Sequence, residues 1–446
     1  MKPRPSLPPG PYLVVGLARS GEAAALALRA RGAEVIGCDA GAPDVLKLRQ
    51  AAGRLSQQGV EVHLGESGEA LAARAGTLIK SPGVPQQAPA VRAARARPIP
   101  VLGELELAWR LLPNEFIAVT GTNGKTTTTE WVGHIHRVAG LPVAVAGNVG
   151  TAVSSLIGSL APDTAVVCEA SSFQLEDAAL FAPEAAVLLN LSPDHLDRHP
   201  SYDAYVAAKL RAFAHQGNDD IAVAPAGLEL EELGGCARRV LFGSAPEAEL
   251  ADRVGRLWWD QRPLLRDDEL PLPGEHNREN AMAAAAVCLA RGIDEHAVAA
   301  GLRTFEGVPH RLELVAECGG VRYVNDSKAT NVASTLVALH SFPRGIRLIA
   351  GGRGKRQDFF ALTTLVTERC SAVYLFGEAA DELAAALAET SVPVHDVGDL
   401  EQAVRSARAA AGAGEVVLLS PACASYDQYP DFEARGEHFR ALVVQA

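Results

Sequence analysis

The sequence predicts an α/β protein of three domains, each built around a mainly parallel sheet. Three observations support this prediction. The chain has 446 residues, more than one hydrophobic core usually serves and enough for about three domains of ordinary size. Short apolar segments alternate with helical segments along most of the chain, which is typical of parallel sheets. Polar or glycine-rich loops follow several apolar segments, and ligands bind at such strand ends.

The composition is that of a globular protein. Hydrophobic residues make up 48% and charged residues 21%, and the net charge is −12. The negative charge argues against a nucleic-acid partner, which needs clustered Lys and Arg. No apolar run approaches the roughly 18 residues of a membrane span, and residues 1–10 lack the apolar core of a signal peptide. The seven scattered cysteines include no C-x-x-C pair, which is typical of reduced thiols. We therefore expect a cytoplasmic protein without membrane insertion.

The first predicted domain, residues 1–103, begins in a Rossmann-like way. An apolar segment at 12–16 leads through a glycine turn into an alanine-rich helix, and a second apolar segment, 34–39, ends in an aspartate. The turn glycines are Gly16 and Gly21, so the full G-x-G-x-x-G fingerprint is absent. The pattern therefore predicts a Rossmann-like domain but does not imply a dinucleotide.

The central predicted domain, residues 104–308, contains the most informative motif. The apolar segment 117–120 runs into the glycine-containing turn 121–124, and Lys125 then opens a helix. Backbone N–H groups in such a turn bind phosphates, the lysine neutralises phosphate charge, and the next hydroxyl ligates Mg²⁺. The usual eight-residue pattern needs glycine where this chain has Val119, so the loop is a shortened variant. We expect a P-loop NTPase-like domain; the alternative is a tight turn followed by a surface lysine.

Polar clusters follow further strand candidates of the central domain, at 142–146, 164–168 and 185–190. Glu169 stands just beyond one strand and is a candidate Mg²⁺ ligand, although a solvated acid or a helix cap gives the same pattern. The run 194–200 is rich in titratable groups. His195 is a metal ligand or charge stabiliser, or else it belongs to a surface loop. Lys209 lies in a helical segment, where a lone lysine is usually on a solvated face.

The last predicted domain, residues 309–446, repeats the Rossmann-like rhythm, with strand candidates at 321–325, 346–350, 372–376 and 415–419. Three polar loops follow these strands: 325–331, 351–358 and 420–431. The first two each offer a cation among exposed N–H groups, which is the chemistry that binds a carboxylate or a phosphate. The three loops are expected to meet at one site.

These motifs together resemble those of the Mur ligases and folylpolyglutamate synthases. The loop 121–126 (GTNGKT) is similar to both groups. The segments 169–175 (EASSFQL), 325–331 (NDSKATN) and 420–428 (SPACASYDQ) resemble the Mur ligases that add D-glutamate, and the matches span residues 81–436. The alternative among enzymes is a folylpolyglutamate synthase or another Mur ligase. The alternative outside enzymes is a non-catalytic nucleotide switch.

The resemblance implies an ATP- and Mg²⁺-dependent ligase of peptidoglycan synthesis. We expect it to act as a monomer. Its substrates would be UDP-N-acetylmuramoyl-L-alanine and D-glutamate. The L-alanyl carboxylate would attack the γ-phosphate of ATP to give an acyl phosphate, and the amine of D-glutamate would displace phosphate. The three domains would bind, in chain order, the UDP-sugar, ATP and the amino acid.

The resemblance also implies roles for individual residues. The ATP-binding residues would be Gly121, Thr122, Asn123, Gly124, Lys125, Thr126, Thr127, Asn277, Arg311 and Asp326. The metal ligands would be Thr126, Glu169, His195 and Lys209, the lysine being carried as a carbamate. The residues in contact with the other substrates would be Ser81, Gly83, Asn148, Ser171, Thr330, Ser425 and Phe432. The catalytic residues would be Lys125, His195, Lys209, Lys328 and Lys355.

Overall fold

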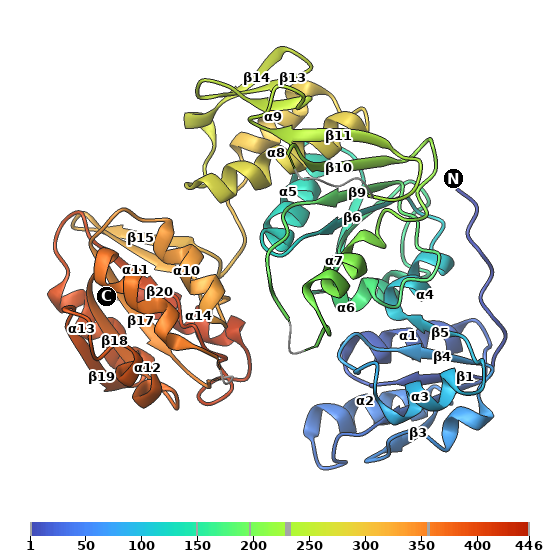
Figure 1. Ribbon diagram of the computed structural model, residues 1–446. Coiled ribbons are helices and arrows are strands. Elements are labelled where there is room, and N and C mark those ends of the chain that lie inside the picture. Colours follow the sequence, from blue (N-terminus) through green and yellow to red (C-terminus); the bar gives the residue numbers. More distant parts are fainter. Residues whose placement is uncertain (1, 149, 196–197, 228–232, 355–356, 445–446) are drawn as a thin grey trace. The chain divides into compact units, whose positions relative to one another are not determined.

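A computed structural model describes residues 2–148, 150–195, 198–227, 233–354 and 357–444 (Figure 1). The chain divides into two compact units, Met1–Phe305 and Glu306–Ala446. The first unit contains two sheets and the second contains one. The protein is therefore α/β with mainly parallel sheets, as the sequence predicts. The division into three domains at residues 103/104 and 308/309 stays a prediction.

The first sheet has five parallel strands in the order β3-β2-β1-β4-β5. The strands are β1 Tyr12–Val15, β2 Val35–Asp39, β3 Glu61–Leu64, β4 Thr77–Lys80 and β5 Val101–Gly103. The helices are α1 Arg19–Ala30, α2 Leu46–Gln57 and α3 Pro89–Arg95, with a 3₁₀ helix at Leu71–Arg74. Successive residues of β1 point to opposite faces, so Leu13 and Val14 enter two different buried clusters. Both faces of this sheet are therefore packed, which places the free polar groups at its strand ends.

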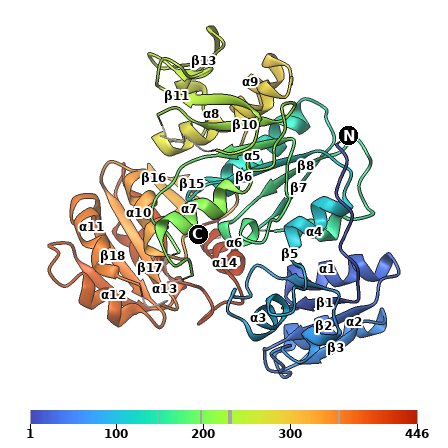
Figure 2. The same ribbon diagram turned by 45° about the vertical axis from the view of Figure 1, so that its right-hand side comes forward.

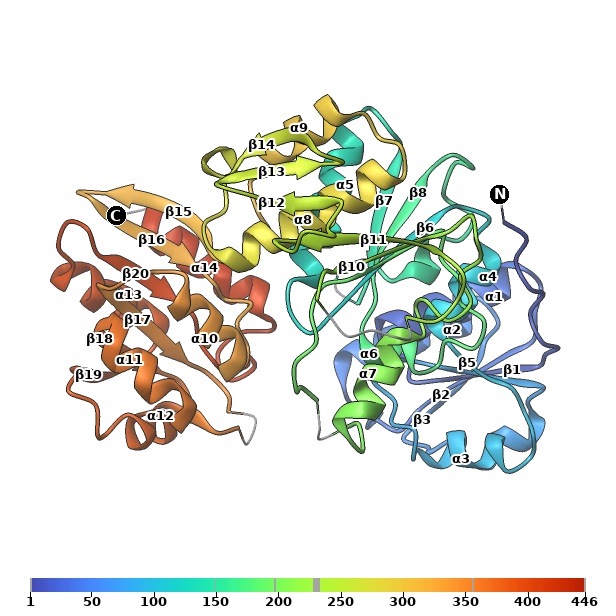
Figure 3. The same ribbon diagram turned by 45° about the horizontal axis from the view of Figure 1, so that its top comes forward.

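The second sheet has nine strands in the order β14-β13-β12-β11-β10-β9-β6-β8-β7. They are β6 Phe116–Thr120, β7 Val143–Gly147, β8 Ala165–Glu169, β9 Ala185–Leu188, β10 Ile221–Pro225, β11 Arg238–Gly243, β12 Leu250–Asp252, β13 Arg256–Trp259 and β14 Arg262–Arg266. In this sheet order, all strands from β12 to β7, including β6, are parallel. The strands β13 and β14 add an antiparallel extension (Figure 3).

Helices cover the central sheet: α4 Glu104–Leu111, α5 Lys125–Val138, α6 Ser172–Leu175, α7 Tyr202–Leu210, α8 Glu275–Ala290 and α9 Glu295–Arg303, with 3₁₀ helices at Val153–Leu156 and Asp267–Glu269. The helices α5 and α8 lie side by side (Figure 2). The alanines of α8 permit this close approach, and Trp131 of α5 stacks on Phe305 with ring centroids 4.5 Å apart. This packing fixes the start of α5, where the phosphate loop ends.

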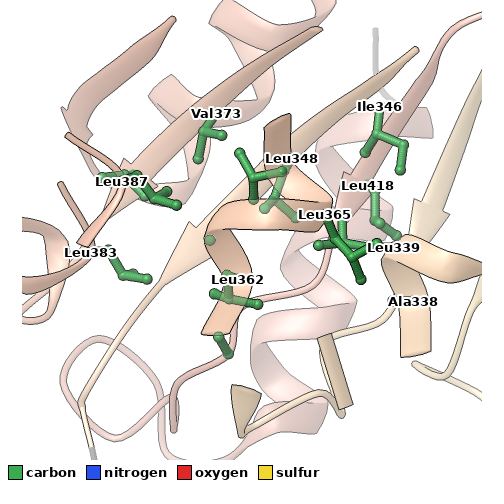
Figure 4. Close-up of a cluster of buried hydrophobic side chains, with 14 of the residues drawn as sticks. Ala338, Leu339, Ile346, Leu348, Leu362, Leu365, Val373, Leu383, Leu387 and Leu418 are labelled. Carbon is green, nitrogen blue, oxygen red and sulfur yellow. The ribbon is translucent and has the colours of Figure 1, made fainter. Parts of the chain in front are cut away.

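The third sheet, in the second unit, has the order β15-β16-β20-β17-β18-β19. Its strands are β15 Glu313–Cys318, β16 Val321–Asn325, β17 Ile346–Gly351, β18 Cys370–Phe376, β19 Val394–Gly398 and β20 Val416–Leu419. Its helices are α10 Val332–His340, α11 Thr363–Arg369, α12 Ala380–Ala386, α13 Leu400–Ala410 and α14 Phe432–Val444, with a 3₁₀ helix at Phe359–Leu362. Only β15 pairs antiparallel among these strands. Figure 4 shows the core on one face of the sheet, where Leu348 and Leu418 meet Leu339 and Leu362.

The strand candidates of the second and third predicted domains correspond to β7, β8, β9, β16, β17, β18 and β20, so these predictions are confirmed. The sequence pattern did not predict β3, β15 and β19. Their residues are mostly exposed or half-buried, because each strand lies at an edge of its sheet, and they lack the continuous apolar run of a central strand. None of the helices in the described ranges is long and apolar enough to cross a membrane.

Candidate functional site

The loop between β6 and α5 has the backbone geometry of a phosphate-binding turn. Gly121 has φ 148° and Gly124 has φ 83°, conformations that favour glycine. A Cβ at Gly124 would stand 2.0 Å from Oδ1 of Asn280, and one at Gly121 would stand 2.9 Å from Cβ of Leu189. Both glycines are therefore required by backbone conformation and by close packing. Lys125 follows directly as the first residue of α5.

Polar neighbours hold the loop from outside. The hydroxyl groups of Thr122 and Tyr205 are 2.9 Å apart, and the backbone N–H of Asn123 donates to the side chain of Asn190 at 2.8 Å. Thr127 is buried in the first turn of α5. These contacts leave the loop preorganised before any phosphate binds.

The Lys125 side chain bends back over its own loop. Its Nζ donates to the carbonyl oxygens of Gly121 and Thr122 at 3.0 and 2.8 Å. The Nζ group therefore lies over its own turn, the one that the sequence predicts to bind phosphate. That Lys125 neutralises phosphate charge stays a prediction.

Glu169 ends β8 and links the phosphate loop to Asn148. One of its carboxylate oxygens accepts from Oγ1 of Thr126 at 2.7 Å, and the other accepts from Nδ2 of Asn148 at 3.0 Å. The parallel register explains this meeting, since Glu169 pairs with Val119 of β6 on one side and with Gly147 of β7 on the other. Only 4% of Glu169 is exposed.

Mg²⁺ prefers oxygen ligands, and the Thr126 hydroxyl and the Glu169 carboxylate both provide them. Their 2.7 Å contact brings the two oxygen ligands together at the end of the phosphate loop, so these residues fit a magnesium ion there. Among the described residues, no group of three or more His, Cys, Asp or Glu side chains is arranged to hold a metal. The fit therefore rests on the hydroxyl–carboxylate pair and on phosphate oxygens as further ligands.

Lys209 is buried in the interior, although a lone lysine on a helix usually faces solvent. Only 1% of the residue is exposed, its Nζ donates to the carbonyl oxygen of Gly121 at 2.6 Å, and the ammonium lies 4.5 Å from the centre of the Tyr205 ring. Burial, together with the nearby charge of Lys125, lowers the pKa of Lys209 to about 6. The amine is therefore largely neutral at pH 7.

His195 lies nearer the surface, in the loop after β9. Its φ is 54°, 46% of its side chain is exposed, and Nε2 is 3.4 Å from a carboxylate oxygen of Asp194. The ring stands 4.8 Å from that of Phe173. His199, to which the sequence motifs assign no role, is buried against Phe173 and shares a 3.0 Å hydrogen bond with Ser172. This loop therefore packs on the start of α6.

Ser171 caps the N-terminus of α6 in a capping box. Its backbone N–H donates to the side chain of Gln174 at 3.0 Å, and its hydroxyl accepts from the backbone N–H of Gln174. Burial of both side chains holds the segment after Glu169 in one conformation. The side chain of Gln174 lines the nearby cavity.

A cavity of ≈560 Å³ lies at the carboxyl ends of the first sheet. Three residues predicted to contact substrate line it, namely Ser81, Gly83 and Asn148. The Ser81 hydroxyl donates to the carbonyl oxygen of Gly16 at 2.6 Å, which closes the wall between the two turns. Asp39 also lines the cavity, and its carboxylate accepts from the backbone N–H of Leu17 at 2.7 Å. The cavity therefore combines polar turns with an acidic group, and its volume falls in the range of small-molecule sites.

Asn277 lies in the first turn of α8, where its Nδ2 donates to the carbonyl oxygen of Pro273 at 2.8 Å. Asn280, one turn further on, is a residue that the sequence motifs did not reveal. Its Oδ1 accepts from the hydroxyl of Thr128 at 3.3 Å and lies against Gly124. The start of α8 therefore buttresses the phosphate loop.

In the second unit, Asp326 is the centre of a buried polar cluster at the end of β16. Its carboxylate accepts from the Ser420 hydroxyl at 2.8 Å and from the backbone N–H of Leu312 at 3.2 Å. Burial raises the pKa of Asp326 to about 7, and the charge of Arg311 opposes that rise. Asp326 and Arg311, both predicted to bind ATP, therefore lie close enough to interact.

The loop after Asp326 packs on the start of α14. The Lys328 ammonium lies 5.8 Å from the ring centre of Phe432, and the backbone N–H of Thr330 donates to the carbonyl oxygen of Lys328 at 2.8 Å. Ser425 is buried in the loop after β20, where its carbonyl oxygen accepts from the backbone N–H of Tyr429. Lys355 lies outside the described residues.

The buried Arg435, which no sequence motif revealed, joins these loops in the second unit. Its guanidinium donates to the Ser327 carbonyl oxygen at 2.8 Å and to that of Cys423 at 3.1 Å. Burial lowers the pKa of Arg435 to about 10. The arginine therefore ties the loop after β16 to the loop after β20.

Comparison with known proteins identifies the family. The family model for the Mur ligase middle domain matches residues 119–288, and the model for the Mur ligase, glutamate ligase domain matches residues 310–423. The UDP-N-acetylmuramoylalanine--D-glutamate ligase of Pelotomaculum thermopropionicum is 42% identical, and the alignment covers 97% of each chain. The chain belongs to the Mur ligase family. The enzyme of the same name from Anaeromyxobacter dehalogenans is 44% identical, again over 97% of each chain.

Solved Mur ligase structures share the fold. UDP-N-acetylmuramate-alanine ligase from Thermotoga maritima superposes with a TM-score of 0.61 at 19% identity, covering 98% of this chain and all (100%) of the other. MurF from Acinetobacter baumannii gives a TM-score of 0.62 at 17% identity, covering 97% of this chain and 93% of the other. At such low identity these structures support the Mur ligase fold alone.

Proposed function

We propose that this Mur ligase uses ATP to join D-glutamate to UDP-N-acetylmuramoyl-L-alanine in peptidoglycan synthesis. The observation that carries the proposal is the position of Glu169 between the phosphate loop and the cavity of the first sheet. Its two carboxylate oxygens contact Thr126 on one side and Asn148 on the other. A substrate in the cavity thus has a route to the terminal phosphate of ATP.

The reaction divides into two steps. The L-alanyl carboxylate attacks the γ-phosphorus, which gives an acyl phosphate and ADP. The amine of D-glutamate then attacks the acyl carbon, the C–O bond to phosphate breaks, and phosphate leaves with release of one proton. Lys125 and the N–H groups of the loop hold phosphate charge, so the anionic carboxylate can approach.

Thr126 and Glu169 are the residues that would hold Mg²⁺, which when bound neutralises phosphate charge. We further propose that Lys209 is carbamylated and joins His195 at a second metal site. The support is the low pKa of Lys209, because a neutral amine can attack carbon dioxide, forming an N–C bond and releasing a proton. Burial beside Gly121 keeps the amine next to the phosphate loop.

The second unit would supply the remaining binding groups. We propose that Arg311 and Asp326 bind the nucleoside of ATP together with Asn277. Lys328, Thr330, Lys355, Ser425 and Phe432 would bind the amino acid and stabilise the acyl phosphate. Ser171, which belongs to the first unit, would contact substrate. A dicarboxylate amino acid suits a cation flanked by hydroxyl groups.

An ADP-release assay tests the proposal. The full chain is given ATP, Mg²⁺ and UDP-N-acetylmuramoyl-L-alanine, with D-glutamate, L-glutamate, L-lysine or meso-diaminopimelate in separate reactions. We expect ADP and a product heavier by one glutamate residue with D-glutamate alone. Equal turnover with another amino acid would contradict the substrate assignment, and ATP binding without any product would favour a nucleotide switch.

A further inference from the structure

A buried ion pair joins the first sheet to the segment that follows α6. Nζ of Lys80, at the end of β4, lies 2.8 Å from Oδ2 of Asp177, and the exposed fractions of the two side chains are 0% and 3%. The backbone carbonyl oxygen of Asp177 also accepts from the N–H of Gly103 at 3.1 Å. The pair therefore links chain segments that belong to different sheets of the first unit.

The same two side chains close the loop that follows β4. Lys80 donates from Nζ to the carbonyl oxygen of Val84 at 2.8 Å. Asp177 accepts at Oδ1 from Nε2 of Gln86, also at 2.8 Å. The loop is thus anchored at residues 84 and 86, and residues 81–85 between β4 and the second anchor line the ≈560 Å³ cavity.

The opposite wall of that cavity comes from the central sheet. Asn148, after β7, and Gln174, in α6, line it there. Asp177 lies three positions after Gln174 in the chain, so the carboxylate that anchors the loop belongs to the segment that also carries this wall. The ion pair consequently joins the loop of one wall to the segment that carries the other.

Stability alone does not explain a buried ion pair at this place. Removing two charges from water costs about as much as their attraction returns, so an apolar pair of similar volume is often equally stable. In some proteins a buried charge pair fixes one specific geometry, which apolar contacts leave adjustable. Precise positioning of a polar loop matters most where the loop must present hydrogen-bonding groups to a ligand.

We propose that Lys80 and Asp177 are positioning residues for the sugar nucleotide. They hold Ser81 and Gly83 at the distance from Asn148 and Gln174 that the uridine diphosphate portion requires. The inference rests on the proposed function, because it takes a UDP-linked substrate as the occupant of the cavity.

The test compares the full chain with Lys80→Met, Asp177→Asn and the double variant. Calorimetry measures the Kd values for UDP, UDP-N-acetylmuramoyl-L-alanine and ATP, and thermal unfolding gives Tm. We expect the Kd for both uridine ligands to rise about tenfold or more in all three variants. The Kd for ATP should stay within about twofold, since the phosphate loop keeps its own contacts.

The double variant separates positioning from a structural role. Each single variant leaves one buried charge unpaired and should lower Tm, whereas the double variant leaves none and should recover most of that loss. Its Kd for the uridine ligands should nevertheless stay raised. The matched control is Arg4→Met/Glu184→Gln, which removes another largely buried pair, 3.0 Å apart, whose residues do not line the cavity. This control should leave every Kd unchanged.

Two results would overturn the inference. If the double variant binds the uridine ligands as tightly as the wild type, the pair is not a positioning element. If its affinities for the uridine ligands and for ATP fall equally, the substitutions disturb the whole protein and not the cavity in particular. A wild-type protein that binds neither uridine ligand contradicts the proposed function itself, and the inference falls with it.

Discussion

Lys125 and Lys209 donate hydrogen bonds to one acceptor, the carbonyl oxygen of Gly121, at 3.0 and 2.6 Å. Two ammonium groups around one oxygen repel each other, and the charge of Lys125 adds to burial in lowering the pKa of Lys209. The amine of Lys209 is therefore largely neutral at pH 7.

The Lys125→Ala variant should lose turnover by at least about a thousandfold, the scale expected when a preorganised contact to phosphate charge is removed. The ADP-release assay measures the loss. Circular dichroism and Tm check that the protein folds, and Lys47→Ala, an exposed lysine on α2, is the matched control. Near-normal turnover in folded Lys125→Ala would remove the loop from the mechanism.

The Lys209→Ala variant should be inactive, and acetate should restore part of its activity, because a small carboxylate can replace the carbamate oxygens. Acetate should not rescue Lys125→Ala, which loses a cation instead. Wild-type activity after bicarbonate depletion should recover more slowly below about pH 6, since the protonated amine does not react with carbon dioxide. An unmodified Lys209 in active, bicarbonate-supplied crystals would contradict the proposal.

Replacing Gly124 by alanine should weaken ATP binding at least about tenfold, because the new methyl group collides with Asn280. Gly140→Ala is the matched control: Gly140 has φ 71°, and a Cβ added there would meet nothing within 4 Å. Both variants bear a backbone cost of about 1 kcal/mol. Calorimetric titration with ATP should separate them, and equal affinities would show that the close packing against Asn280 is unimportant.

The stability of the second unit should depend on pH through Asp326. Burial raises the folded-state pKa from 3.8 to about 7, so the unfolded chain loses this proton at a lower pH than the folded protein. This contribution is therefore fully present below about pH 4 and is lost as pH rises through 7. Asp326→Asn stays neutral and does not lose this contribution. Its Tm minus the Tm of the wild type should therefore increase as pH rises from 4.5 to 7.5.

The matched control for that experiment is Asp381→Asn, which changes an exposed aspartate in the first turn of α12. Its Tm difference from the wild type should not follow the same trend. A constant difference between Asp326→Asn and the wild type across this pH range would show that Asp326 is ionised in the folded protein.

The phosphate loop and the polar strand ends were predictable because their signals are local. Gly121 to Thr127 form one continuous motif, and the parallel-sheet rule places Asn148 and Glu169 at one edge, where the register of β7 and β8 brings them together.

Contacts between residues far apart in the chain leave no local motif in the sequence. The pairing of Lys80 with Asp177 depends on how two sheets pack, and neither residue belongs to a recognisable motif. The burial of Lys209 was equally hidden, because its Nζ contacts Gly121, which lies 88 positions away in the chain. Edge strands such as β15 were missed because their half-exposed residues lack an apolar run.

The two edge strands of the nine-stranded sheet, β14 and β7, differ in their protection against pairing with a strand of another chain. β14 contains Pro263, which has no N–H to donate, between Arg262 and Arg266. Proline and charge at an edge discourage pairing with a strand of another chain. β7, with the sequence VAVAG, has neither. During refolding or concentrated expression, we therefore expect intermolecular aggregation to begin along β7 rather than β14.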